Sequence, residues 1–196
     1  MAGTAPALPA PRTPGRYAVA LVCLGNICRS PMADVVLTAR VEEAGLADRV
    51  TVASSGTGDW HVGRPMDRRA AATLTGAGYD PSRHRARQFG PAWHEEYDLV
   101  LAMDAQNLVD VVAMGSTTGP TTGPTTDPTA GEERRVLLFR DFDPVEPGGE
   151  VPDPYYGGHA GFEEVLTMVE RTAASIVAHL DSLLRPHDLG EEHPAP

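Results

Sequence analysis

Four short apolar runs, rich in valine and leucine, recur along the chain between longer stretches of mixed polarity. A continuous apolar run is typical of a strand that is buried on both faces of a parallel sheet. The runs therefore predict strands over residues 17–23, 50–54, 98–103 and 135–139.

The stretches between these runs carry apolar residues near helical spacing. The first of them begins with Ser30 and Pro31, a pair that fits an N-cap followed by proline at the first helical position, and it is closed by Gly45. Strands that alternate with helices predict an α/β fold, a doubly wound three-layer αβα domain around a four-stranded parallel sheet. The helices are predicted over residues 31–44, 67–75, 104–114 and 161–184.

Three segments have compositions that do not suit a packed core. Residues 1–16 are rich in proline and alanine and predict a disordered leader. Residues 115–131 contain a short TTGP/TTDP repeat and predict a low-complexity surface insertion, and residues 186–196 predict a flexible tail. The folded domain is therefore expected over residues 17–185.

Charge and cysteine content restrict the partners. The net charge of -11 argues against nucleic acid, which requires a basic footprint, and against anionic membrane surfaces. Cys23 and Cys28 are too few for a secreted disulfide framework, and the opening residues lack the apolar region of a secretory signal. We expect a cytoplasmic protein that is a monomer or a weak dimer and that needs no cofactor. We expect no metal site either, because the two cysteines have no nearby histidine partners.

The segment between the first strand and the first helix carries the candidate chemistry. Cys23 and Arg29 are separated by five residues in a loop that enters a helix. Backbone N–H groups of such a loop and the helix N-terminus bind phosphoryl oxygens, and they also stabilise a thiolate. An arginine holds two phosphoryl oxygens through paired hydrogen bonds. The alternative is a cysteine that only fills space in the core, since this spacing also arises by chance.

The amino-acid sequence of this loop is characteristic. VCLGNICRSP resembles the signature loop of the low-molecular-weight protein tyrosine phosphatases. The resemblance continues in SSGTGDWHVGRPMD, HRARQ, LAMD and VPDPYYGG, so that it spans roughly residues 18–184 in the order of the family. It implies a phosphatase I-like fold and a metal-independent hydrolysis of protein phosphotyrosine and aryl phosphates through a phosphocysteine.

The resemblance also implies roles for individual residues. Cys23 matches the nucleophile, Arg29 the phosphate-binding arginine and Asp153 the general acid. Pro152 and Pro154 restrict the backbone on both sides of that acid, although a Pro-Asp-Pro sequence alone is also an ordinary turn. The supporting polar residues are Ser30, Ser54 and His84, and Asn26 is matched to the same bracing network. The residues expected to bind substrate are Leu24, Gly25, Asn26, Ile27, Cys28, Trp60, Tyr155 and Tyr156.

Several of these residues also have plainer interpretations. Trp60, Tyr155 and Tyr156 either wall a deep slot that selects phosphotyrosine or serve only in packing. Cys28 either forms a protective disulfide with the nucleophile on oxidation or fills space behind the loop. His61 stands where some members of the family have asparagine, which leaves the specificity of the rim open.

Two other functions compete with a phosphatase. A thiol-coupled arsenate reductase uses the same fold and loop, but it relays oxidation through a further cysteine, and none follows Cys28. A catalytically silent phosphotyrosine-binding module is the second alternative. The presence of Cys23, Arg29 and Asp153 together argues against it.

Overall fold

The computed structural model describes residues 5–115 and 134–185. The predicted tail over residues 186–196 lies outside the described residues. So does the predicted insertion, apart from Gly115, which ends a helix.

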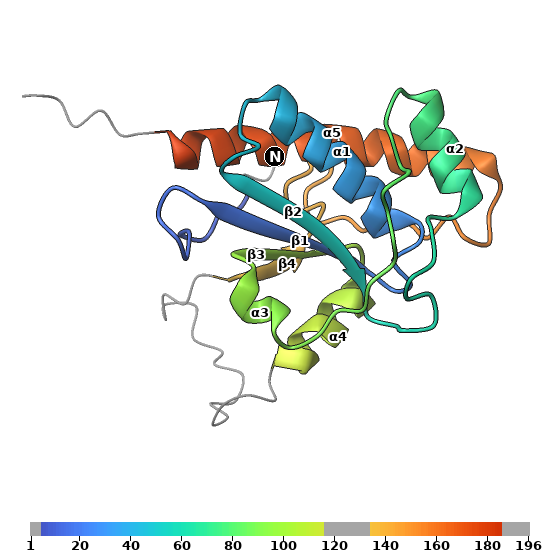
Figure 1. The fold of residues 1–196 in the computed structure, drawn as a ribbon, viewed down its shortest axis with the longest axis horizontal. Helices are drawn as coiled ribbons and strands as arrows, with labels where there is room; N and C mark the ends of the chain where they lie inside the picture. The colour runs from blue at the N-terminus through green and yellow to red at the C-terminus, as the bar shows by residue number, and fades with distance from the viewer. Residues whose placement is uncertain (1–4, 116–133, 186–196) are drawn as a thin grey trace, which may run out of the picture.

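The centre of the protein is one parallel sheet of four strands in the order β2-β1-β3-β4 (Figure 1). In register, Val19 of β1 lies between Val52 of β2 and Leu99 of β3. The predicted parallel sheet is confirmed, with strand ends that differ from the predicted ones by at most two residues. The strands are β1 (Tyr17–Cys23), β2 (Val50–Gly56), β3 (Leu99–Ala102) and β4 (Val136–Leu138).

Helices cover both faces of the sheet, which completes the predicted three layers (Figure 1). One face carries α1 (Arg29–Glu43), α2 (Arg68–Gly76) and α5 (His159–Leu184). The other carries α4 (Ala105–Gly115) and the short α3 (Trp93–Glu96), which the sequence pattern did not predict.

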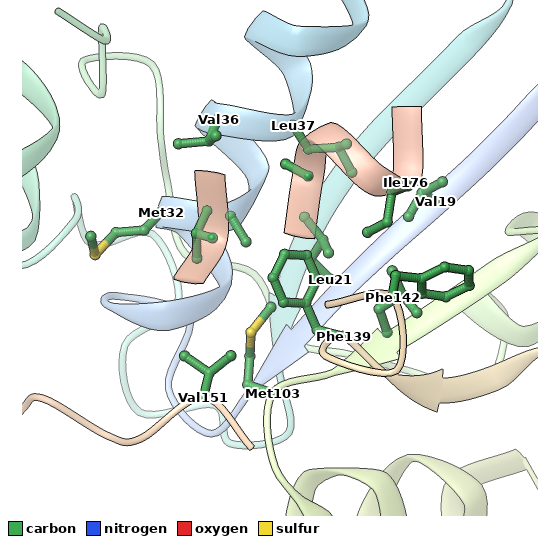
Figure 2. Close-up of a cluster of buried hydrophobic side chains, with 14 of the residues drawn as sticks. Val19, Leu21, Met32, Val36, Leu37, Met103, Phe139, Phe142, Val151 and Ile176 are labelled. Carbon is green, nitrogen blue, oxygen red and sulfur yellow. The ribbon is translucent and has the colours of Figure 1, made fainter. Parts of the chain in front are cut away.

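The larger hydrophobic core lies between the sheet and the pair α1 and α5. Leu21 of β1, Leu37 of α1 and Ile176 of α5 meet there and are fully buried (Figure 2). A smaller cluster, which includes Val22 and Phe89, fills the opposite face. Apolar burial on both faces explains why the strands read as continuous apolar runs.

The predicted disordered leader is wrong for residues 5–16. Leu8 packs against the larger core, and the backbone oxygen of Pro9 accepts a hydrogen bond from the Tyr17 hydroxyl at 3.1 Å. The backbone N–H of Arg12 donates to the buried carboxylate of Asp98 at 2.6 Å. These contacts reach across the fold, so a reading of local composition misses them.

The predicted cap of the first helix is also wrong. α1 begins at Arg29, so Ser30 lies inside its first turn, and no side chain caps the helix at Cys28. The hydroxyl of Ser30 is engaged with the sulfur of Cys23 instead. In α2 a side chain does cap the helix, because Asp67 accepts a hydrogen bond from the backbone N–H of Arg69.

Candidate active site

The phosphate-loop candidate lies at the point where the strand order changes direction. β2 and β3 flank β1 on opposite sides, and Cys23 is the last residue of β1. In open α/β sheets such a switch point opens a crevice at the carboxyl ends of the strands. Here the crevice holds a pocket of about 300 Å³ between the loop, the turn after β2 and the segment before α5.

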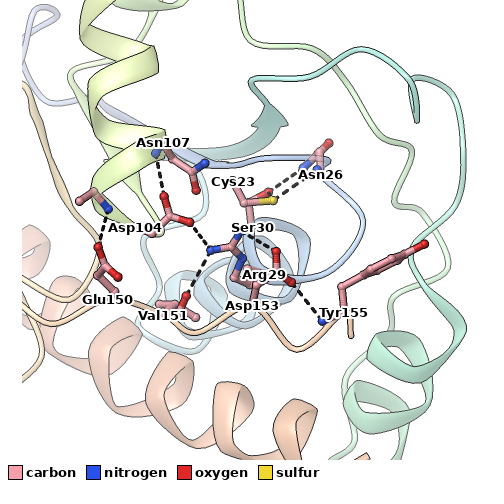
Figure 3. A network of polar contacts seen from close by, with 11 residues as sticks. Cys23, Asn26, Arg29, Ser30, Asp104, Asn107, Glu150, Val151, Asp153 and Tyr155 are labelled. Atoms are coloured by element: carbon pink, nitrogen blue, oxygen red, sulfur yellow. Dashed lines mark hydrogen bonds and ion pairs between the residues drawn. The ribbon is translucent and has the colours of Figure 1, made fainter. Parts of the chain in front are cut away.

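Two donors converge on the sulfur of Cys23 (Figure 3). The Ser30 hydroxyl lies 3.0 Å from Sγ and the backbone N–H of Asn26 lies 3.3 Å from it. Hydrogen bonds to a sulfur favour its ionised form. The Cys23 side of the pocket is therefore built to stabilise a thiolate.

Asn26 braces the loop from behind. It is fully buried and adopts a left-handed backbone conformation, with φ of 52°. Its side-chain nitrogen donates to Ser30 Oγ at 2.9 Å, and its side-chain oxygen accepts from the Arg87 backbone N–H at 2.8 Å. Asn26 was expected both to brace the loop and to bind substrate; its side chain is directed into this support, and it is absent from the pocket lining.

His84 completes the support. Its Nε2 lies 2.8 Å from the backbone oxygen of Asn26. Desolvation by burial lowers the pKa of His84, although the bond to Asn26 and the nearby Asp34 act in the opposite direction. At neutral pH the neutral ring therefore carries its proton on Nε2 and donates it to Asn26.

Ser54 was expected to brace the phosphate loop, but its side chain is bonded to a residue of α1 instead. Its hydroxyl donates to Asp34 Oδ2 at 2.7 Å, and not to Asn26. Burial raises the pKa of Asp34, while the hydrogen bond from Ser54 opposes that rise. Ser54 and Asp34 thus support the base of α1 behind the loop.

The guanidinium of Arg29 is buried and held from two directions (Figure 3). Nη1 donates to Asp104 and, at 3.2 Å, to the backbone oxygen of Val151. Nη2 donates to Asp153 Oδ2 at 2.8 Å. Burial alone would lower the pKa of Arg29, but the negative groups Cys23, Asp104 and Asp153 raise it. The side chain is a fixed positive charge at the pocket floor.

Asp153 is brought into the pocket by the segment that precedes α5. The backbone N–H of Val151 donates to the oxygen of Met103 at 2.8 Å, which ties this segment to the end of β3. The other carboxylate oxygen of Asp153 accepts from the Tyr155 backbone N–H at 3.0 Å. Residues 130 positions apart in sequence, Cys23 and Asp153, thus line one pocket.

The rim is aromatic, as predicted. Trp60 is 60% exposed and Tyr156 is 95% exposed, and both line the pocket. A side chain at Gly58 would collide with the Trp60 ring, so this glycine lets the ring lie over the backbone. Apart from Asn26, the other residues predicted to bind substrate also line the pocket, namely Leu24, Gly25, Ile27, Cys28 and Tyr155, and His61 joins them.

Cys28 is a buried free thiol in the pocket wall. Burial raises its pKa, and the negative charges of Asp67 and Cys23 raise it further. Cys28 therefore stays protonated at neutral pH. Cys23 is also a free cysteine.

Two further residues of the site were not singled out from the sequence. Asp104 fixes Arg29 and is itself held by the backbone N–H of Asn107 at 2.7 Å. Its signal is a carboxylate two residues after the end of β3, a strand that pairs with β1. Gly56 ends β2, and a Cβ there would lie 2.7 Å from the backbone oxygen of Leu24, so only glycine lets the loop pack this closely.

The comparisons with known proteins agree with this geometry. Residues 18–185 match the family described as low molecular weight phosphotyrosine protein phosphatase. This chain belongs to that family. The matched residues include the whole pocket, so the activity is that of a protein-tyrosine phosphatase and the predicted family resemblance is confirmed.

Individual relatives extend over most of the phosphatase domain. A low molecular weight protein-tyrosine-phosphatase of Streptomyces coelicolor is 45% identical over 164 residues, which cover 83% of this chain and 92% of that protein. Low molecular weight protein-tyrosine phosphatase A of Mycobacterium tuberculosis is 39% identical over 85% of this chain and 93% of its own length. The crystal structure of YfkJ from Bacillus subtilis superimposes with a TM-score of 0.73 at 28% identity, covering 85% of this chain and 96% of that chain.

These findings do not favour the arsenate reductase or the silent binding module. In the described part of the chain, no group of three or more histidine, cysteine or acidic residues lies together in a way that could hold a metal ion. Within the same residues, no helix is long and apolar enough to cross a membrane.

Proposed function

We propose that the phosphatase acts through a covalent phosphocysteine on Cys23. The sulfur attacks phosphorus, the S–P bond forms as the P–O bond to the tyrosine breaks, and Asp153 gives its proton to the leaving oxygen. Arg29 binds the equatorial phosphoryl oxygens, where charge accumulates in the transition state. Nη1 of Arg29 is held by Asp104 and Val151, which supports this role because the guanidinium is oriented before substrate arrives.

The second step reverses the proton transfer. Asp153, now a carboxylate, takes a proton from water as the water oxygen attacks phosphorus. The P–S bond breaks, and Cys23 leaves as a thiolate that the Ser30 hydroxyl and the Asn26 N–H receive at 3.0 and 3.3 Å. Inorganic phosphate then departs, and the enzyme is back in its starting form, because Asp153 now carries the proton that it took from water.

The observation that carries this proposal is the convergence of Cys23, Arg29 and Asp153 on one pocket. Rapid acid quench of the enzyme with ³²P-labelled phosphotyrosine peptide tests it. Label should be found on Cys23 in wild type, whereas Cys23→Ser should neither turn over substrate nor yield an S-phosphate. Equal hydrolysis by wild type and Cys23→Ser would refute the nucleophile assignment.

The aromatic walls of the pocket support phosphotyrosine proteins as substrates, since an aromatic slot accommodates a phenolic ester better than a short phosphoserine. We further propose that the protein acts in the cytoplasm, where its two free cysteines remain reduced, as a monomer or weak dimer that binds no nucleic acid or membrane. The net charge of -11 supports the last point. Size-exclusion chromatography with light scattering measures the oligomeric state, and the same experiment with added duplex DNA measures binding to nucleic acid.

A further inference from the structure

The distribution of paired and unpaired arginines is uneven. The chain has 16 lysine and arginine residues together, and all of them are arginine. Several are neutralised by carboxylates, for example Arg140 by Asp143 and Arg29 by Asp104 and Asp153. Five arginines between residues 64 and 87 have no carboxylate within ion-pair distance among the residues that the structure describes. We name them the arginine strip: Arg64, Arg68, Arg83, Arg85 and Arg87.

The strip begins beside the mouth of the active-site pocket. Arg68 follows Asp67, whose backbone N–H donates to Ile27 of the phosphate loop at 2.8 Å. Arg64 lies three residues before Asp67, at the end of the turn that carries the rim residue His61. Arg64 and Arg68 are both exposed, and no hydrogen bond of their side chains is present among the described residues.

The other half of the strip is held next to Arg64 by the backbone. Ala86 donates to the oxygen of Arg64 and accepts from the N–H of Gly63, both at 2.8 Å. The two segments accordingly run together at the carboxyl end of the sheet (Figure 1). Arg85 and Arg87 flank Ala86, and the guanidinium of Arg87 lies 5.4 Å from the centre of the Trp93 ring.

The local charge opposes the charge of the whole protein. Residues 61–87 hold six arginines against two aspartates, Asp67 and Asp80, although the chain carries a net charge of -11. Asp67 is paired with Arg69, and Asp80 accepts from the backbone N–H of Ser82. A cluster of unneutralised arginine in an acidic protein attracts and orients a partner of opposite charge.

We propose that the arginine strip binds acidic residues that flank the phosphotyrosine of the substrate, so that the enzyme prefers phosphotyrosine segments rich in aspartate and glutamate. This inference rests on the proposed function. The far end of the strip borders a hollow of about 590 Å³ that also contains Glu42 and Asp80. The contacts with substrate are therefore placed at Arg64 and Arg68, which are exposed and do not line that hollow.

Steady-state kinetics with two phosphotyrosine peptides test this preference, one flanked by aspartate and glutamate and the other by asparagine and glutamine. We expect wild type to have about a tenfold higher kcat/KM for the acidic peptide at low salt, because its KM for that peptide is lower. The difference between the peptides should shrink as salt screens the charges. The double variant R64Q/R68Q should lose that advantage and keep its kcat on p-nitrophenyl phosphate. The matched control R16Q/R134Q removes two exposed arginines that precede β1 and β4, at the opposite end of the sheet, and should keep the preference.

Equal kcat/KM for the two peptides in wild type overturns the inference, and so does an equal loss in R64Q/R68Q and R16Q/R134Q. Inhibition by duplex DNA or anionic vesicles without any peptide preference also overturns it. Absence of turnover of p-nitrophenyl phosphate by wild type would remove the proposed function and the inference with it. Normal turnover without peptide preference would remove the inference alone.

Discussion

Arg29 and Asp153 are ion-paired across the pocket, with Nη2 of the arginine 2.8 Å from Oδ2 of the aspartate. The same guanidinium is proposed to bind the phosphoryl group. A phosphoryl dianion therefore competes with the Asp153 carboxylate for Arg29 and repels it. Substrate binding therefore releases Asp153 from its ion pair, so that the carboxyl is available to act on the leaving oxygen.

We expect Asp153→Asn to lower kcat by about 10²–10⁴-fold for phenyl phosphate and much less for p-nitrophenyl phosphate. The nitrophenolate leaves without a proton, whereas the phenolate needs one. The measurement is kcat for a series of substituted aryl phosphates, and the variant should show a steeper dependence on the acidity of the leaving group. The same dependence in both proteins would mean that Asp153 is not the acid.

The same variant supplies its own control for folding and binding. Because the asparagine side chain carries no negative charge beside Arg29, inorganic phosphate should inhibit Asp153→Asn at least as strongly as it inhibits wild type. Weaker inhibition would indicate that the substitution disturbs the pocket itself.

The two cysteines should differ in reactivity. Burial, with Asp67 and Cys23 nearby, raises the pKa of Cys28, so this thiol stays protonated, and only thiolates are alkylated rapidly. At neutral pH iodoacetate should label Cys23 alone, since Ser30 and Asn26 donate hydrogen bonds to its sulfur. Peptide mass spectrometry measures the site, and inorganic phosphate should protect it. Equal labelling of both cysteines would contradict the arrangement.

Ser30→Ala should slow the breakdown of the phosphocysteine. The hydroxyl lies 3.0 Å from Cys23 Sγ, so its removal takes away a donor that stabilises the departing thiolate. Loss of one such donor typically costs about 10²–10³-fold in kcat. Stopped-flow traces with p-nitrophenyl phosphate should show a burst of nitrophenol followed by a slow steady state. The control Ser175→Ala removes a hydroxyl from α5, far along the chain from the loop, and should give wild-type traces. A slow phase without a burst would place the role of Ser30 in the first step.

Local sequence predicted the elements and the phosphate loop, since a buried strand, a C-x5-R loop and a helix are contiguous. It did not predict the hydrogen bonds that orient Arg29, because Asp104 and Val151 are 75 and 122 residues away. The position of the leader was missed for the same reason, since Arg12 reaches Asp98 across 86 residues. Ser30 shows a different limit: its pattern fits a helix cap, but the sulfur of Cys23 is the acceptor that the fold brings to its hydroxyl.

A buried ion pair outside the active site should govern acid stability. The Asp143 side chain is fully buried and accepts from Arg140 and Arg171, each at 2.8 Å. Burial alone would raise the pKa of Asp143, but the hydrogen bonds from Arg171, Val145 and Arg140 outweigh it and lower that pKa.

Asp143→Asn should therefore reduce the free energy of unfolding at pH 7 by about 3–5 kcal/mol, the usual cost of breaking a buried ion pair. Since the pKa of Asp143 is lower in the folded state, its contribution is fully present above the unfolded value of about 3.9 and is lost as pH falls toward the folded value. Urea unfolding from pH 7 down to pH 3 measures the difference between wild type and variant. It should be constant above about pH 5 and should shrink below about pH 4. A difference that does not change with pH would show that the carboxylate charge is not what stabilises this region.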